Sequence, residues 1–96
     1  MNPRLALQAN RQLIRRVVES HRATNARVFG SVPRREDREG SDLDLLVDPL
    51  PGATLFDLGA IQIELEEALG VPVDVLTPGD LPARFRAKIL QEAVPV

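Results

Sequence analysis

The chain has 96 residues, the size of one small domain, so we expect a single domain over residues 1–96. Its 44% hydrophobic and 27% charged residues are typical of a globular protein, and the absence of cysteine excludes disulfides, thiolate zinc sites and a cysteine nucleophile. No apolar run approaches the ~20 residues of a membrane span and no secretory signal opens the chain, so we expect a cytoplasmic protein without membrane association.

The charge is distributed unevenly along the chain. Residues 1–38 contain nine arginines and three acidic residues, whereas residues 39–96 contain three basic and eleven acidic residues. This asymmetry favours an anionic ligand or a charged partner. Nucleic acid is one candidate, but the three aromatic residues each lie in an apolar stretch and form no stacking platform, so direct nucleic-acid binding is not expected.

The first predicted element is a helix. Asn2 can cap its start, and Pro3 suits the first helical position because it has no N–H to leave unpaired. Apolar residues at helical spacing predict one continuous helix over about 5–21.

Two strands and a loop are predicted next. Short apolar runs predict strands over 26–29 and 43–47, and the charged, proline-containing segment 32–40 predicts a loop between them. Thr54 followed by Asp57 matches a capping box at the start of a second helix.

The second half of the chain alternates helix and strand. Helical spacing continues to residue 69, and Gly70 is expected to end this helix. A strand is predicted over 71–76. Asp80 is then expected to cap a last helix that continues to about residue 93. The residues of that helix expected to face the core are Phe85, Ile89 and Leu90. A whole helix between the last two strands is the usual crossover between parallel strands, which predicts an α+β fold, a mixed β-sheet flanked by helices.

Two carboxylates lie two positions apart at the start of the second predicted strand. Because side chains alternate across a strand, Asp42 and Asp44 share one face, roughly 7 Å apart at Cα. A divalent cation would relieve their repulsion, and hard oxygen ligands suit Mg²⁺ or Mn²⁺. If the strand over 71–76 pairs with this one, Asp74 can complete a three-carboxylate, two-metal site of the kind that catalyses phosphoryl or nucleotidyl transfer.

A Gly-Ser turn ends the first predicted strand. Gly30 allows the backbone to approach a ligand closely, and Ser31 offers a hydroxyl and a backbone N–H to a phosphate. Each feature alone is weak evidence, because an isolated Asp-x-Asp is more often a turn or a solvated strand end. Asp74 alone also suits an edge strand or a cap.

Together and at this spacing, these motifs resemble a known signature. Gly-Ser, ten residues and then Asp-x-Asp is similar to the pattern of the DNA polymerase beta-like nucleotidyltransferase superfamily. The resemblance is closest to its minimal members, the MNT-type antitoxins that pair with HEPN toxins, and it covers residues 26–96. It implies the minimal polymerase beta-like nucleotidyltransferase fold.

The resemblance also implies a role for each site residue. Gly30 and Ser31 would bind the phosphates of a nucleoside triphosphate, Asp42 and Asp44 would bind two Mg²⁺ ions, and Asp74 would bind the catalytic metal and help to deprotonate the attacking hydroxyl. The implied activity is Mg²⁺-dependent transfer of AMP from ATP to a tyrosine hydroxyl of a HEPN-type toxin. The chain would then be an antitoxin within a hetero-oligomer.

Other functions fit the motifs less well. A haloacid-dehalogenase-like phosphatase places its Asp-x-Asp after an apolar strand, whereas here the apolar run follows the pair. An EF-hand would need a different glycine and a final glutamate, and the Rossmann and P-loop glycine patterns do not occur. A nucleotidyltransferase fold that neutralises its partner by binding alone stays open.

Three further features have structural interpretations. Arg34, Arg35 and Arg38 form either a solvated charged run or a contact to the triphosphate. Asp48 is expected to cap the end of its strand rather than bind metal. His21 is expected at the surface, near the C-terminus of the first helix.

Overall fold

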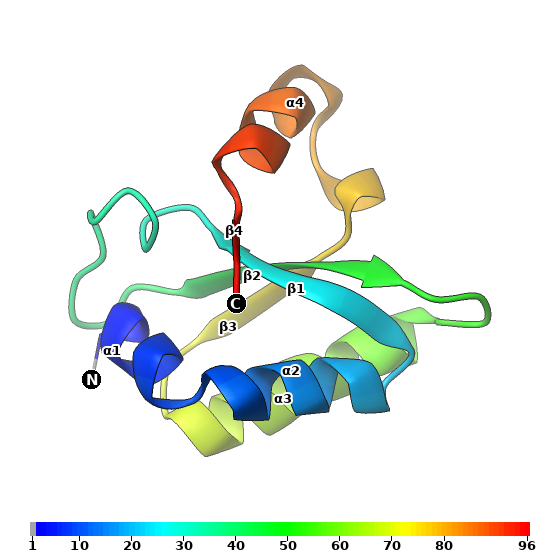
Figure 1. Ribbon diagram of the computed structural model, residues 1–96, viewed down its shortest axis with the longest axis horizontal. Helices are drawn as coiled ribbons and strands as arrows, with labels where there is room; N and C mark the ends of the chain where they lie inside the picture. The colour runs from blue at the N-terminus through cyan, green and yellow to red at the C-terminus, as the bar shows by residue number, and fades with distance from the viewer. Residues whose placement is uncertain (1) are drawn as a thin grey trace.

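The computed structural model describes residues 2–96, and a four-stranded mixed sheet forms its centre, in the order β3-β2-β1-β4 (Figure 1). The strands are β1 (Ala23–Phe29), β2 (Leu43–Pro49), β3 (Val73–Leu76) and β4 (Val94–Pro95). β1 pairs antiparallel with both β2 and β4, whereas β2 and β3 are parallel. The mixed sheet confirms the predicted α+β fold class.

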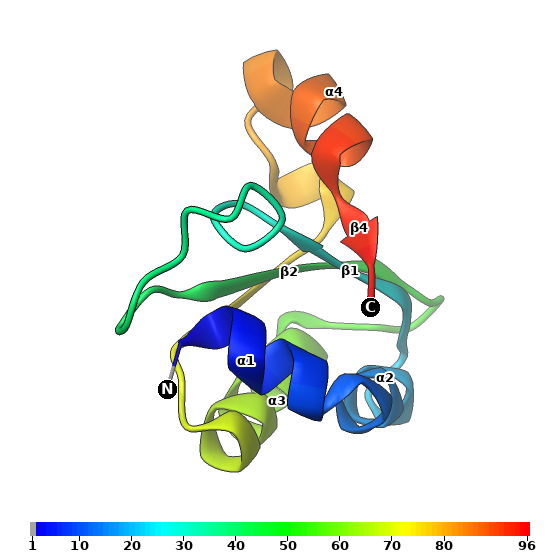
Figure 2. The same ribbon diagram turned by 60° about the vertical axis from the view of Figure 1, so that its left-hand side comes forward.

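Helices lie on both sides of this sheet. They are α1 (Pro3–Ala9), α2 (Arg11–Ser20), α3 (Leu55–Leu69), a 3₁₀ turn η1 (Pro78–Asp80) and α4 (Ala83–Glu92). α1, α2 and α3 cover one face, and α4 projects from the opposite side (Figures 1 and 2). Within residues 2–96, no helix is long and apolar enough to cross a membrane.

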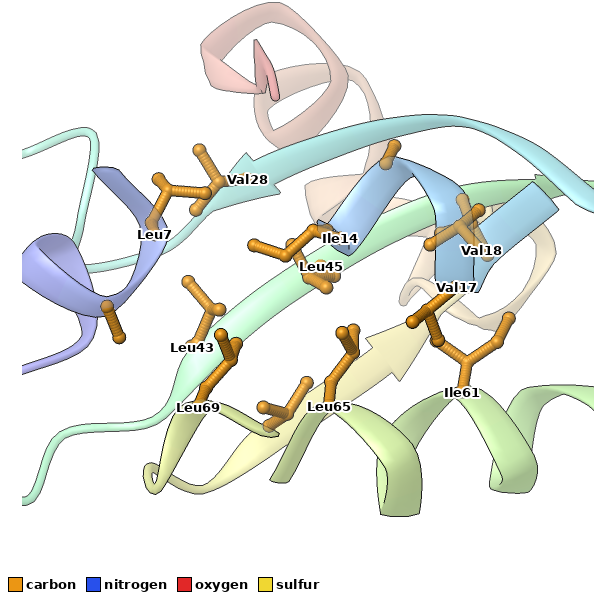
Figure 3. Packing of buried hydrophobic residues seen from close by; sticks show 14 of the residues in the cluster. Leu7, Ile14, Val17, Val18, Val28, Leu43, Leu45, Ile61, Leu65 and Leu69 are labelled. Carbon is orange, nitrogen blue, oxygen red and sulfur yellow. The ribbon is translucent and has the colours of Figure 1, made fainter. Parts of the chain in front are cut away.

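The hydrophobic core lies between the sheet and the first three helices. Leu43 and Leu45 of β2 are fully buried there, opposite Ile14 of α2 and Ile61 and Leu65 of α3 (Figure 3). The predicted alternation along β2 is therefore confirmed, and it leaves the carboxylate at position 44 on the other side of the sheet.

Local signals set the helix ends largely as predicted. The Asn2 side chain accepts a hydrogen bond from the Leu5 N–H at 3.0 Å. Thr54 and Asp57 form the predicted capping box at the start of α3, which ends at Gly70 with φ of +71°. α3 is the crossover between the parallel strands β2 and β3.

The first predicted helix is in fact two helices that meet at Asn10. Its backbone φ of −134° leaves the helical region, its N–H donates to the Leu7 carbonyl, and its side-chain amide donates to the Ala6 carbonyl at 2.9 Å. The apolar stripe continues through this break, so hydrophobic periodicity alone could not reveal it. The break is stabilised because the asparagine side chain donates a hydrogen bond to a free carbonyl at the end of α1.

The expectations for the last helix were wrong in two respects. Asp80 accepts a hydrogen bond from the Thr77 N–H and so closes η1, whereas α4 begins three residues later. No residue of α4 is buried, and Phe85 and Leu90 are 47% and 40% exposed, so this helix does not contribute to the core. The short strand β4, which follows α4, was not predicted.

Asp48 has a structural role at a bulge in β1. Its carboxylate accepts hydrogen bonds from Arg27 at 2.6 Å and from Asn25 at 2.8 Å. Asn25 has φ of +55°, and the pairing of β1 with β2 shifts register there. This ion pair holds the strand end, in line with the structural interpretation of Asp48. His21 ends α2 and contacts Glu64 at 2.8 Å.

We expect Ile61→Ala to lower the free energy of unfolding by about 2–5 kcal/mol, because it leaves a cavity in the core. Ile63→Ala on the same helix is the matched control: Ile63 is 59% exposed, and its loss should change stability by less than about 0.5 kcal/mol. Urea unfolding of both variants tests this, and equal effects would contradict the packing described here.

Candidate active site

The predicted carboxylates gather at one end of the β2–β3 pair. In the parallel register, Asp44 lies directly opposite Asp74. Asp42 immediately precedes β2, and Asp44 is also the partner of Phe29, the last residue of β1, so it lies next to Gly30. Three acidic side chains and the glycine turn are thus brought together by strand pairing, as the sequence predicted.

Burial and neighbouring negative charges raise the pKa values of two of these carboxyl groups, Asp44 and Asp74. The pKa of Asp44 is raised to about 6, first by burial and then by the negative charges of Asp74 and Asp42, while Arg34 acts in the opposite direction. The pKa of Asp74 is also raised, by desolvation and by the charge of Asp42. Asp42 and Asp74 both act on Asp44, and Asp42 also acts on Asp74, so the three carboxylates lie close enough to interact electrostatically.

Gly30 permits the close approach of the turn to this cluster. Its φ of +79° lies in the left-handed region, and a Cβ placed on it would overlap Asp44 Oδ2 and lie 3.2 Å from Asp44 Cγ. No other residue type fits here without turning the Asp44 carboxylate aside. The glycine is therefore required both by backbone conformation and by contact.

Arg34 is held over the same turn. Its Nε donates to the Gly30 carbonyl at 3.1 Å and lies 3.8 Å from the Glu36 carboxylate. Ser31 is half-buried, and its carbonyl accepts from the Glu36 N–H at 2.9 Å. Of the three arginines in the predicted loop, Arg34 therefore lies at the site, whereas Arg38 donates its backbone N–H to Ser41 Oγ.

The donor set suits a hard divalent cation. Neighbouring negative charge contributes to the raised pKa values of Asp44 and Asp74, and a bound cation would relieve it; oxygen ligands of this kind suit Mg²⁺. Within residues 2–96, however, no three acidic or histidine side chains are already disposed to hold one ion. Since Asp42 and Asp74 are exposed, rotation of their side chains could bring the ligands together.

A pocket of about 410 Å³ adjoins the cluster. Gly30, Arg34 and Asp44 line one side of it, and Phe85 and Lys88 of α4 lie on the other. Sequence reasoning missed the α4 residues because their apolar spacing is the same as that of a core-facing helix. The available signal was Lys88, one of only three basic residues in the acidic half of the chain.

Comparison with known protein families decides what kind of site this is. The family model described as a nucleotidyltransferase domain matches residues 11–96. The chain belongs to this family. A Methanocaldococcus jannaschii protein provisionally named protein adenylyltransferase MJ0435 is 42% identical over 80 residues, 83% of this chain and 86% of that protein. Protein adenylyltransferase MntA of Thermococcus cleftensis is 36% identical over 67 residues, 70% of this chain and 68% of that protein.

Solved structures agree with this nucleotidyltransferase assignment. One that is described as a minimal nucleotidyltransferase is 43% identical, with a TM-score of 0.86 over 97% of this chain and 95% of that one. A toxin–antitoxin structure with AMP-PNP has a TM-score of 0.75 over 90% of this chain and 71% of that one, at 16% identity, which is a likeness of fold alone. The predicted family, fold and enzyme class are confirmed.

We expect Gly30→Ala to abolish stabilisation by Mg²⁺ with ATP, because its Cβ displaces the Asp44 carboxylate. Gly40→Ala is the matched control: Gly40 has φ of +85°, so it carries the same backbone strain, but its Cβ would meet nothing within 4 Å. The difference in Tm with and without Mg²⁺ and ATP measures the effect. Equal ligand-induced shifts in the two variants would show that the contact with Asp44 is unimportant.

Asp44 lowers the stability of the folded nucleotidyltransferase at neutral pH. Its pKa of about 6, against a usual 3.8, means that its favourable contribution is complete below about pH 3.8 and is lost as the pH rises through about 6. We expect Asp44→Asn to raise stability at about pH 7.5, on the order of 1 kcal/mol after solvent screening, and not at about pH 4.

Thermal unfolding between about pH 4 and pH 7.5, without divalent cations, tests this expectation for Asp44. Glu67→Gln removes an exposed carboxylate from α3 and serves as the control. If the two variants were equally stable across this range, the electrostatic description of the cluster would be wrong.

Proposed function

We propose that this nucleotidyltransferase transfers AMP from ATP to a tyrosine hydroxyl of a HEPN-type toxin and thereby acts as an antitoxin. The observation that carries the proposal is the cluster of Asp42, Asp44 and Asp74 beside the Gly30 turn. The names of the two relatives support protein adenylylation. A solved MntA–HepT toxin–antitoxin structure shares the fold with a TM-score of 0.68 at 16% identity.

The turn after β1 would hold the triphosphate. Gly30 lets the backbone come close to the phosphates, and Ser31 would donate its hydroxyl and N–H to their oxygens. Arg34 is anchored to the Gly30 carbonyl, so its guanidinium is kept near the same anion. These groups would orient the α-phosphorus toward the carboxylates.

The carboxylates would prepare the acceptor. Two Mg²⁺ ions held by Asp42, Asp44 and Asp74 would neutralise the charge that develops on the phosphate oxygens. The acceptor oxygen forms a bond to the α-phosphorus as the bond to the bridging oxygen breaks, and pyrophosphate leaves. Asp74 would help to take the proton from the attacking hydroxyl.

A protein acceptor suits the exposure of this site. Asp42 and Asp74 are exposed, so a tyrosine on the surface of another protein can reach them. The acidic second half of the chain, with eleven carboxylates against three basic residues, would complement a basic partner in a hetero-oligomer. Both proteins are expected in the cytoplasm.

The test is incubation of the chain with ATP, Mg²⁺ and the protein encoded beside it, followed by intact-mass analysis. We expect the partner to gain about 329 Da for each AMP, the mass that transfer with loss of pyrophosphate adds. Asp44→Asn should abolish the gain, and Glu67→Gln should leave it unchanged.

Two other outcomes would contradict the proposal. A tight complex whose partner keeps its mass after ATP and Mg²⁺ would indicate an antitoxin that acts by binding alone. Transfer of AMP to a free small molecule, with no complex formed, would overturn the assignment of a protein acceptor.

A further inference from the structure

α4 is a helix whose position the core does not explain. None of its residues is buried, and both views show it standing on the side of the sheet opposite the other helices (Figures 1 and 2). Arg86 nevertheless fixes it: Nε donates to the Pro78 carbonyl and Nη2 to the Leu81 carbonyl, both at 2.9 Å. A helix that is anchored but unburied presents its side chains to something other than the core.

The inner side of α4 forms one wall of the pocket beside Asp44. Phe85, Lys88 and Ile89 line this wall, and Gly30 and Arg34 line the other. The volume of about 410 Å³ is within the range of small-molecule sites. The α4 side of the pocket thus combines apolar Phe85 and Ile89 with charged Lys88 and Glu92. The opposite side carries Arg34 and Asp44.

Two residues of this wall, Phe85 and Lys88, are explained neither by burial in the core nor by an ion pair within the described residues. The Phe85 ring is 47% exposed, and the Arg84 guanidinium lies 4.9 Å from its centroid, which keeps the ring in place while it lines the pocket. Lys88 makes no ion pair within the described residues 2–96. An exposed aromatic ring and a free cation beside a phosphate-binding turn match the two parts of a nucleotide.

We infer that α4 is the nucleoside-binding wall of the active site. The base of the bound nucleotide packs against Phe85 and Ile89, and Lys88 faces Arg34 across the pocket so that both neutralise the triphosphate. This inference rests on the proposed function, since it assumes that a nucleotide occupies the pocket. Stacking of a base on an aromatic ring tolerates any base, so Phe85 sets affinity more than base preference.

The test separates the contribution of the base from that of the phosphates. The chain is titrated, in the presence of Mg²⁺, with each of two probes: ATP and inorganic tripolyphosphate. We expect Phe85→Ala to weaken ATP binding about tenfold, the scale of one lost base–aromatic contact, and to leave tripolyphosphate binding within about twofold. Lys88→Gln should weaken both probes. Phe56→Ala is the matched control, because Phe56 is 89% exposed at the start of α3 and lies outside the pocket.

The outcomes distinguish this inference from the proposed function. If the native protein and Phe85→Ala bind ATP equally well, the inference that α4 binds the base is wrong, and the proposed function stands. An equal loss of ATP and tripolyphosphate in Phe85→Ala would also overturn the assignment, because the ring would then act by placing α4. If the native chain binds neither probe, both proposals fail.

Discussion

Repulsion among Asp42, Asp44 and Asp74 is the constraint on which the rest of the structure depends. β2 and β3 pair with two carboxylates directly opposite each other, so pairing itself concentrates negative charge at one end of the sheet. Such crowding persists only where the surrounding fold holds the strands in place. That support comes from the other face of β2, where Leu43 and Leu45 are fully buried. A slip of one residue would expose these leucines and bury the carboxylates, so the core that stabilises the fold also fixes the register of the site.

Strand geometry explains why much of the site could be predicted from the sequence. Alternation along the strand places Asp42 and Asp44 on one side and Leu43 and Leu45 on the other, independently of the rest of the fold. Asp74 needed one further inference, that its strand is the parallel neighbour, and the length of the intervening helix supplied it. The turn was recognisable from the spacing of Gly30-Ser31 before Asp42 and Asp44, and the structure adds that Gly30 has a positive φ and lies against the Asp44 carboxylate.

The features that the sequence did not reveal depend on contacts between distant segments. Helical spacing shows that Phe85 and Ile89 share a face, but a core and a ligand pocket require the same apolar spacing. Asp80 could cap either η1 or α4. It accepts a hydrogen bond from the Thr77 N–H because the chain turns directly after β3. Asn10 interrupts a continuous apolar stripe because its amide can satisfy a carbonyl of α1, an alternative that periodicity does not register.

The two faces of the sheet contribute unequally to stability and to the candidate site. On one face, three helices bury apolar side chains, and substitutions there act on folding. On the other face lies Asp44, whose raised pKa destabilises the folded protein at neutral pH and makes a bound cation favourable. α4 also lies outside the core, since none of its residues is buried. Leu46 is nevertheless fully buried on the face of Asp44, so both faces of β2 contribute to its stability. A small domain can keep a charged site at the end of such a strand because buried leucines hold the strand in place.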